Sequence, residues 1–243
     1  MNEIEKFKKE RSERVASYEK EENLKKAASD FMKESTSPLY SYNFSWMGRP
    51  IIQYPQDMIA MQELIWAIKP DLIIETGIAH GGSLIYYASL MELIGHGEIL
   101  GIDIDIRKHN KKAIEEHPMF KRISMIEGSA ISDDIITQVK VKAKDKKRVL
   151  VSLDSNHTHE HVLKELELYS PFVTKDSYLV VFDTIVEDLP PNMYDNRPWD
   201  VGNNPKTAVF EFLKNNDSFI IDKEIDNKLL ISVAPDGYLK KVK

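Results

Sequence analysis

The stretch IIETGIAHGGSLIYYA, Ile73 to Ala88, decides the fold of this chain. It consists of a β-branched apolar run, the acid Glu75, a turn that holds Gly77, Gly81 and Gly82, and an apolar run of helical length. This order predicts a buried strand that passes through a tight turn into a helix. In open α/β sheets, ligands bind at such turns, beside the carboxyl ends of the strands.

Strand-like and helix-like segments alternate along the chain on both sides of this turn. The predicted strands are 71–75, 98–104, 122–128, 148–154 and 177–183, and the predicted helices are 82–94, 110–117, 131–143, 158–170 and 205–215. This alternation predicts a doubly wound, mostly parallel sheet with right-handed crossovers. Near the end, the strand-like runs 219–225 and 229–233 are separated only by Asp226-Asn227-Lys228, which predicts an antiparallel hairpin. We therefore expect a Rossmann-like α/β fold whose seven-stranded sheet ends in an antiparallel hairpin.

Two regions precede the alternating segments. Residues 1–36 are almost solidly charged with sparse apolar positions, which predicts an N-terminal helical extension ahead of a main domain at 37–243. The extension is either a solvated helical face or a surface through which the chain forms a homo-oligomer. A further helix, ended by Pro70, is predicted from the apolar spacing in PQDMIAMQELIWAIKP.

Composition excludes several classes of protein. The net charge of −6 argues against a nucleic-acid or anionic-membrane surface, because both partners require a basic face. Apolar runs fall short of the roughly 18–20 residues that a membrane helix needs, and the first residues are too charged for a secretory signal. The absence of cysteine excludes disulfides, thiolate zinc sites and cysteine nucleophiles. We expect a cytoplasmic protein without nucleic-acid or membrane partners.

The acid in the glycine turn indicates which ligand the turn suits. Neither the Walker pattern nor the dinucleotide fingerprint G-x-G-x-x-G is present. Glu75 would repel a pyrophosphate by a few kcal/mol, whereas it suits a cationic ligand. Asp103, at the end of the next strand, is placed to accept both hydroxyls of a ribose. A cationic ribose ligand without phosphate describes S-adenosylmethionine, although Glu75 could instead cap the helix that follows it.

Several stretches together resemble the cephalosporin hydroxylase-like family of class I methyltransferases, which is similar to macrolide-sugar and surface-polysaccharide O-methyltransferases. The resemblance covers about residues 40–235 and is carried by WMGRPIIQYPQDM, PDLIIETGIAHGGSLIYYASLMEL, GIDIDIRKHN, LDSNHTHEHVLKEL, YLVVFDT and RPWDVGNNPKTAVFEFL. It implies a class I methyltransferase fold and an O-methyltransferase that uses S-adenosylmethionine, often with a divalent metal. It also implies a cofactor site made of Glu75, Gly77, His80, Gly81, Gly82, Ser83, Asp103, Gly128, Ser129 and Asp154, in which the segment Glu127-Gly128-Ser129 flanks the adenine.

Acids at two strand ends and a nearby histidine provide candidates for the chemistry. Asp154 and Asp183 close neighbouring strands and would offer hard oxygen ligands to Mg²⁺. His157 follows closely and is our candidate for the base that deprotonates the acceptor hydroxyl, with His159 as second choice and His161 directed along the helix. In the resembling enzymes an acid precedes the second metal-binding aspartate, but here that position is Phe182, so Glu187 or Asp188 would have to substitute. Alternatively, the two aspartates cap helices or pair with lysines.

Two loops rich in aromatic and polar residues are candidates for the substrate site. Flat rings with amides and arginine suit carbohydrate recognition, so we expect a sugar of a surface polysaccharide or of a glycosylated natural product. The candidates are Trp46, Gln53, Tyr54, Arg197, Trp199 and Asn204. Alternatively, these residues pack the loops onto the body. Two other functions stay open, a scaffold that binds the cofactor without methyl transfer and an NAD-dependent oxidoreductase.

Overall fold

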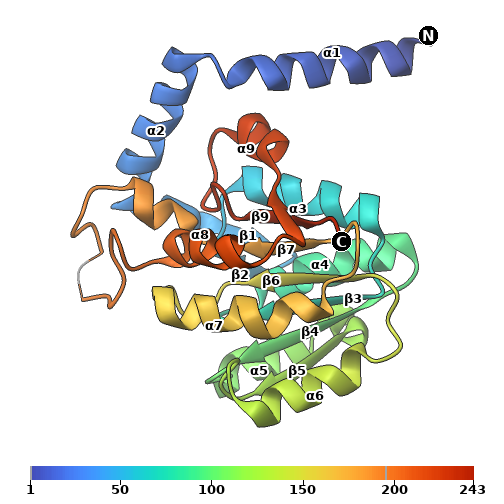
Figure 1. Ribbon diagram of the computed structural model, residues 1–243. Coiled ribbons are helices and arrows are strands. Elements are labelled where there is room, and N and C mark those ends of the chain that lie inside the picture. Colours follow the sequence, from blue (N-terminus) through green and yellow to red (C-terminus); the bar gives the residue numbers. More distant parts are fainter. Residues whose placement is uncertain (1, 195) are drawn as a thin grey trace.

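A twisted seven-stranded sheet forms the centre of the computed structural model, which describes residues 2–194 and 196–243 (Figure 1). The strand order is β5-β4-β3-β6-β7-β9-β8, with β9 antiparallel to both neighbours and the other pairs parallel. The bounds are β3 (Leu72–Thr76), β4 (Glu98–Asp103), β5 (Ile123–Glu127), β6 (Val149–Leu153), β7 (Tyr178–Val181), β8 (Phe219–Ile221) and β9 (Tyr238–Lys241). This confirms the predicted fold class.

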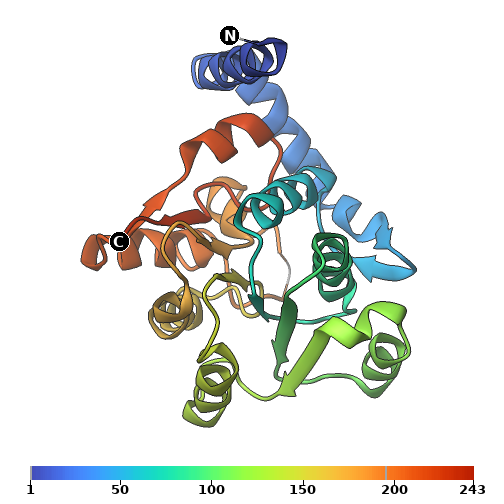
Figure 2. The ribbon, with the colours of Figure 1, turned by 90° about the vertical axis from the view of Figure 1, so that its right-hand side faces the viewer.

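Helices cover both faces of the sheet (Figure 2). One face carries α3 (Pro55–Ile68), α4 (Gly82–Ile94) and α5 (Lys108–Glu115), and the other carries α6 (Asp133–Ala143), α7 (His159–Tyr169) and α8 (Pro205–Asn215). In β3, Ile73 packs into the first layer, whereas Leu72 and Ile74 pack into the second, as the two-residue period of a strand requires. Every residue of β3 and β6 is buried, which is typical of parallel strands covered on both sides.

The prediction for the last strand was wrong in position. The residues between β8 and β9 form α9 (Lys223–Leu229), whose first turn is capped by Asp222, rather than a three-residue turn. Ile225 and Leu229 lie one helical turn apart and are both buried, which favours a helix. The final antiparallel strand is therefore 238–241 instead of 229–233.

The N-terminal part lies outside the sheet. Helix α1 (Glu3–Tyr18) lies against α9, and α2 (Glu22–Thr36) leads down to the body of the molecule (Figure 1). A small antiparallel hairpin follows, β1 (Phe44–Trp46) and β2 (Arg49–Ile51). Short 3-10 helices complete the chain, namely η1 (Tyr40–Asn43), η2 (Pro118–Arg122), η3 (Ser170–Phe172) and η4 (Thr184–Asp188). Among the described residues, no helix combines the length and apolar character needed to cross a membrane.

Candidate active site

The glycine turn after β3 is held close to the end of β6. Gly77 has φ +88°, and a Cβ atom there would lie 2.0 Å from the carbonyl oxygen of Asp154. Its N–H donates to the Ile102 carbonyl of β4 at 2.8 Å. Only a residue without a side chain allows this approach, so Gly77 brings the ends of β3, β4 and β6 together.

Side chains from three other elements fix the rest of the turn. The Asp103 carboxylate accepts hydrogen bonds from the N–H groups of Ile78 and Ala79, at 2.8 and 3.2 Å. On the carbonyl side, Arg49 of β2 donates to the His80 carbonyl at 2.9 Å, and Asn110 of α5 donates to the Ala79 carbonyl at 2.9 Å. The role of Asn110 could not be predicted, because its contact depends on how α5 packs.

A cleft of about 290 Å³ opens at this end of the sheet. It is lined by Gly77, Ala79, Ile102, Asp103, Ile104, Ser129, Ala130, Asp154, Ser155, Asn156, His161 and Trp199. Four of the predicted cofactor residues therefore line it, namely Gly77, Asp103, Ser129 and Asp154. Trp199, predicted for the substrate, lines it as well, and Ser155 and His161 join it without having been predicted there.

The other predicted cofactor residues lie behind the cleft wall. Glu75 is 1% exposed and accepts a hydrogen bond from the Ser83 hydroxyl at 2.8 Å, while burial raises the pKa of its carboxyl to about 8. Gly82 packs against β2, where a Cβ atom would lie 2.1 Å from the Pro50 carbonyl oxygen. His80, Gly81 and Gly128 are also absent from the lining. In this arrangement Glu75 supports the turn from within the body.

Asp154, His157 and Asp183 form a second polar group beside the cleft. One ligand atom from each lies within 4.8 Å of the others, and His157 Nε2 is 3.3 Å from Asp183 Oδ2. Asp154 and His157 follow β6, whereas Asp183 follows β7 and begins η4 with φ +56°. Trp199 packs edge-on against His157, with ring centroids 4.7 Å apart, and also lines the cleft.

Carboxylates accumulate at this end, where His157 lies next to Asp183 and His161 next to Glu165. Burial raises the pKa of the Asp154 carboxyl well above its usual range, and the charges of Asp183, Glu75 and Glu165 raise it further. A bound cation would stabilise the ionised form of these buried carboxyls, so the cluster favours either a metal ion or a positively charged ligand.

The residues considered as replacements for the missing acid are engaged elsewhere. Phe182 is 2% exposed and belongs to the hydrophobic core. Glu187 accepts a hydrogen bond from the Gly202 N–H at 2.8 Å, and Asp188 pairs with Lys206 at 2.6 Å. In the described part of the chain, the third potential metal ligand is His157.

The other two histidines of the run point in different directions. His159 lies 3.2 Å from a Glu211 carboxylate oxygen and 2.8 Å from the Thr207 hydroxyl, both on α8. His161 points to the cleft instead of along the helix. The run is therefore not a shared zinc site.

The predicted substrate residues are mostly held by contacts within the protein. Trp46 donates to the Ser89 hydroxyl at 3.0 Å, Tyr54 shares a hydrogen bond with Ser35 at 2.8 Å, and buried Asn204 caps α8. Arg197 lies over the ring of Trp199. Gln53 is buried, and its Oε1 has no hydrogen-bond partner among the described residues.

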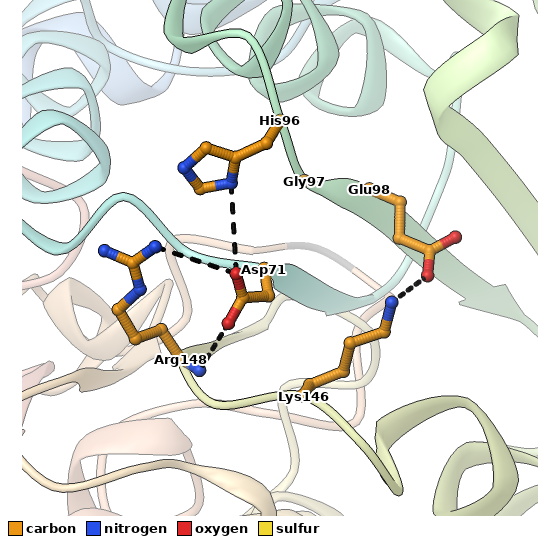
Figure 3. Close-up of a pocket in the computed structure, with 6 residues that line it drawn as sticks. All are labelled: Asp71, His96, Gly97, Glu98, Lys146 and Arg148. Atoms are coloured by element: carbon orange, nitrogen blue, oxygen red, sulfur yellow. Dashed lines mark hydrogen bonds and ion pairs between the residues drawn. The ribbon is translucent and has the colours of Figure 1, made fainter.

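A second hollow, of about 530 Å³, lies at the amino ends of the strands (Figure 3). Here the charges are paired: Lys146 Nζ is 2.6 Å from Glu98 Oε1, and Arg148 Nη2 is 3.7 Å from Asp71 Oδ1. Asp71 also accepts a hydrogen bond from the Arg148 N–H at 2.9 Å, which fixes the start of β6. This cluster joins strands and leaves no excess charge for a ligand.

Comparison with known proteins identifies the family. The family described as Rhamnosyl O-methyltransferase/CmcI matches residues 38–242. This chain belongs to that family. The match confirms the stated resemblance and the prediction of an O-methyltransferase that depends on S-adenosylmethionine.

Individual relatives agree with this assignment. The chain is 29% identical over 222 residues to the rhamnosyl O-methyltransferase of Mycobacterium tuberculosis, covering 87% of this chain and 85% of the relative. It is 30% identical over 168 residues to the Mycobacterium leprae protein of the same name, covering 66% and 71%. An apo structure of CmcI has a TM-score of 0.59 and 18% identity and covers 83% of this chain and 77% of that one. A CmcI structure with Mg and SAM has a TM-score of 0.57 and 17% identity and covers 83% and 78%. At 17–18% identity, the two CmcI structures show that this chain shares their fold.

Proposed function

We propose that this protein transfers a methyl group from S-adenosylmethionine to a hydroxyl of a rhamnose-type sugar, in a surface polysaccharide or a glycosylated natural product. One observation carries the proposal: Asp154 belongs both to the cleft beside the glycine turn and to the Asp154–His157–Asp183 group. A methyl donor in the cleft and an acceptor at that group would meet at this residue. Methyl transfer requires such an in-line approach of two bound reactants.

The cleft fits the proposed cofactor. Gly77 allows the ends of β3 and β6 to lie close together beside the cleft. Asp103 offers a carboxylate to ribose hydroxyls, and Ser129 lies where the adenine is expected. The surplus of carboxylates suits a ligand that carries a sulfonium and an ammonium group, and such a ligand supplies an activated methyl group when bound. A CmcI structure of the same fold contains Mg and SAM, which supports a cofactor of this kind.

The group beside the cleft fits a divalent cation. Asp154 and Asp183 would hold Mg²⁺, which prefers carboxylate oxygens, while the imidazole of His157 is a ligand better suited to other metals. Magnesium at this position would orient neighbouring acceptor oxygens and lower the pKa of the reacting hydroxyl. Asp154 would then connect the metal with the cofactor end of the site.

His157 is placed to accept the proton of the acceptor hydroxyl. Its Nε2 faces Asp183 at 3.3 Å, so the carboxylate orients the ring and stabilises the imidazolium that forms on protonation. Trp199 packs edge-on against the ring. A positioned base of this kind contributes about 10²–10⁴-fold to rate.

The sugar would lie against Trp199 and Arg197. Trp199 presents a flat ring beside His157, and Arg197 lies over that ring as a charged donor. Gln53, whose Oε1 is buried, would not contact the sugar directly. Trp46, Tyr54 and Asn204 would support the site from behind, since their polar atoms are already bonded within the protein.

Residues 1–36 are proposed as a helical extension to a methyltransferase domain at 37–243, in a cytoplasmic protein. The exposed apolar side chains Ile4 and Phe7 of α1 support the hypothesis of oligomer formation through this extension. Light scattering of the full chain and of a chain that lacks residues 1–36 tests it. A monomeric mass for both would contradict it.

The direct test is transfer of label from methyl-tritiated S-adenosylmethionine to rhamnose-bearing acceptors, with magnesium and with EDTA. We expect labelled, O-methylated sugar with magnesium and loss of transfer in EDTA. Calorimetry with S-adenosylhomocysteine and NAD separates the alternatives. Binding of NAD would favour an oxidoreductase, and S-adenosylhomocysteine binding without transfer to any acceptor would favour a scaffold.

A further inference from the structure

Three polar side chains contact one another along one wall of the cleft. The Ser155 hydroxyl donates to Glu165 Oε1 at 2.8 Å, and His161 Nε2 lies 3.3 Å from Ser155 Oγ and 3.7 Å from Glu165 Oε1. Ser155 and His161 line the cleft, whereas Glu165 is fully buried. We call Ser155, His161 and Glu165 the α7 triad.

Burial of the Glu165 carboxyl lowers the stability of the folded protein, which argues against a merely structural role. Its side chain is 0% exposed, and its Oε2 has no hydrogen-bond partner among the described residues. No lysine or arginine of the described chain forms an ion pair with it, so His161 is its ionisable partner. A buried carboxylate with so few partners lowers stability, which indicates that its benefit lies elsewhere.

The face of α7 that carries His161 and Glu165 points toward the part of the cleft expected to hold the adenine. His161, Glu165 and Tyr169 follow one another at four-residue spacing and therefore share a face of the helix. At the far end of this face, the Tyr169 hydroxyl donates to the Ala130 carbonyl at 2.9 Å. Ala130 and its neighbour Ser129 line the cleft. The face is thus anchored to the loop after β5, and its first residue, His161, reaches the same cavity.

We infer that the α7 triad binds the nucleobase end of the cofactor, with Ser155 and His161 in contact with it and Glu165 as the residue that positions them. The inference rests on the proposed function and adds to it the residues that recognise the adenine. Sequence spacing could not show them, because Ser155 lies in a loop and the other two lie on a helix.

The hydrogen bonds within the triad determine what it offers to a ligand. The proton of Ser155 is directed to Glu165, so a lone pair of the hydroxyl stays available as an acceptor. His161 is the one basic side chain among the described residues that line the cleft, and its ring can donate or accept. A purine presents an exocyclic amine that donates and ring nitrogens that accept. Because Glu165 holds both partners before the ligand arrives, less ordering is needed on binding.

The first test measures the binding of two ligands to matched histidine variants. Calorimetry uses S-adenosylhomocysteine and 5′-methylthioadenosine, which keeps the nucleoside but lacks the amino-acid end. We expect His161→Ala to weaken both ligands by about tenfold, as loss of one hydrogen bond to a polar ligand does. His159→Ala is the control, because His159 lies on the same helix with an acidic partner but outside the lining, and both affinities should stay within about twofold.

The second test distinguishes positioning from packing at Glu165. Gln keeps an acceptor for the Ser155 hydroxyl, so Glu165→Gln should retain both affinities within about threefold. Leu fills the space without an acceptor, so Glu165→Leu should weaken both ligands by about tenfold while the melting temperature stays equal or rises. A packing role predicts the reverse for Leu, namely retained binding.

The outcomes separate the inference from the proposed function. Binding of S-adenosylhomocysteine to the unmodified chain with equal affinity in His161→Ala and Glu165→Leu would overturn the inference alone. So would a loss confined to S-adenosylhomocysteine, which would place the triad at the amino-acid end. Failure of the unmodified chain to bind S-adenosylhomocysteine would overturn the proposed function and this inference with it.

Discussion

The two ends of the parallel sheet both carry ionisable side chains but balance their charges differently. At the amino end, Asp71 and Glu98 each face a basic side chain, and the hollow there is the larger of the two described above (Figure 3). At the carboxyl end, Asp154 is surrounded by further acids and has His157 as its nearest basic neighbour in the metal-binding group. Cavity size therefore does not mark the functional end.

The difference in charge balance indicates a structural role for the amino end and a ligand-binding role for the carboxyl end. Paired charges satisfy one another, fix the strand starts and leave little attraction for a ligand. Uncompensated carboxylates lower stability unless a cation joins them, so their presence indicates a binding site. The comparison predicts that changes at the carboxyl end affect activity more than stability, and that changes at the amino end do the opposite.

The largest effect is expected for Asp154→Asn. Loss of this carboxylate removes a proposed metal ligand, so methyl transfer should fall by at least about 10³-fold. The free energy of unfolding should drop by no more than about 1 kcal/mol, because the substitution replaces a carboxyl whose ionised form is disfavoured by burial and by neighbouring acids. The tritium assay and chemical denaturation measure the two quantities. Activity within tenfold of the unmodified chain would contradict the proposed role.

Gly77→Ala should disrupt the contact between the strand ends that shapes the cleft. The new Cβ would lie 2.0 Å from the Asp154 carbonyl oxygen, at φ +88°. We expect a loss of about 3 kcal/mol in stability together with weaker S-adenosylhomocysteine binding. Gly95→Ala is the matched control, since φ is +93° there but nothing lies within 4 Å of the added Cβ. It should cost about 1 kcal/mol and leave binding unchanged.

Asp57 extends the comparison to the pH dependence of stability. It is a buried acid whose hydrogen-bond donors carry no charge. It is fully buried, accepts hydrogen bonds from Ser232, Val233 and Tyr238, and burial raises its pKa from 3.8 to about 6. A raised pKa means that this group favours folding most below pH 3.8 and that its contribution is lost as pH rises toward 6. The difference corresponds to about 3 kcal/mol.

The substitution Asp57→Asn isolates this effect. The variant does not titrate at this position, so the unmodified chain should exceed it in stability by more at pH 4.5 than at pH 7.5. Urea denaturation of both proteins at the two pH values measures the difference. An advantage that is constant, or larger at pH 7.5, would contradict the direction of the shift.

The smallest effect on function is expected at the amino end. Asp71→Asn removes a charge that faces Arg148 and His96 and weakens the hydrogen bonds to the start of β6. Stability should fall by about 1 kcal/mol. Methyl transfer should stay within about twofold in the same assay. A loss of activity as large as that of Asp154→Asn would remove the distinction between the two ends.

The parallel sheet could be predicted from the sequence, whereas contacts between distant segments could not. The alternation of apolar runs was sufficient for the parallel sheet, and strand ends place Asp154 and Asp183 at one edge. The segment after β8 was misassigned because Ile225 and Leu229 fit a strand in isolation. The docking of buried Asp57 to Val233, 176 residues away, helps to fix that segment, and no local pattern reveals it.

Within the site, the roles of individual residues stay predictions, but the structure shows why some were harder to place. Glu75 has the sequence position of a ligand-binding acid, yet its side chain turns inward to Ser83. His161 was assigned to the helix axis because its partner Glu165 is recognisable only when α7 packs on the sheet. Spacing located the edge of the sheet, while burial and long-range contacts decided which side chains face the cleft.

Calorimetric titration with Mg²⁺ tests the charge-balance account most directly. It should be performed with S-adenosylhomocysteine present, on the unmodified chain, Asp154→Asn and Asp71→Asn. The account predicts one saturable site in the unmodified chain and in Asp71→Asn, and loss of that site in Asp154→Asn. Equal binding by all three proteins, or binding lost only in Asp71→Asn, would contradict it.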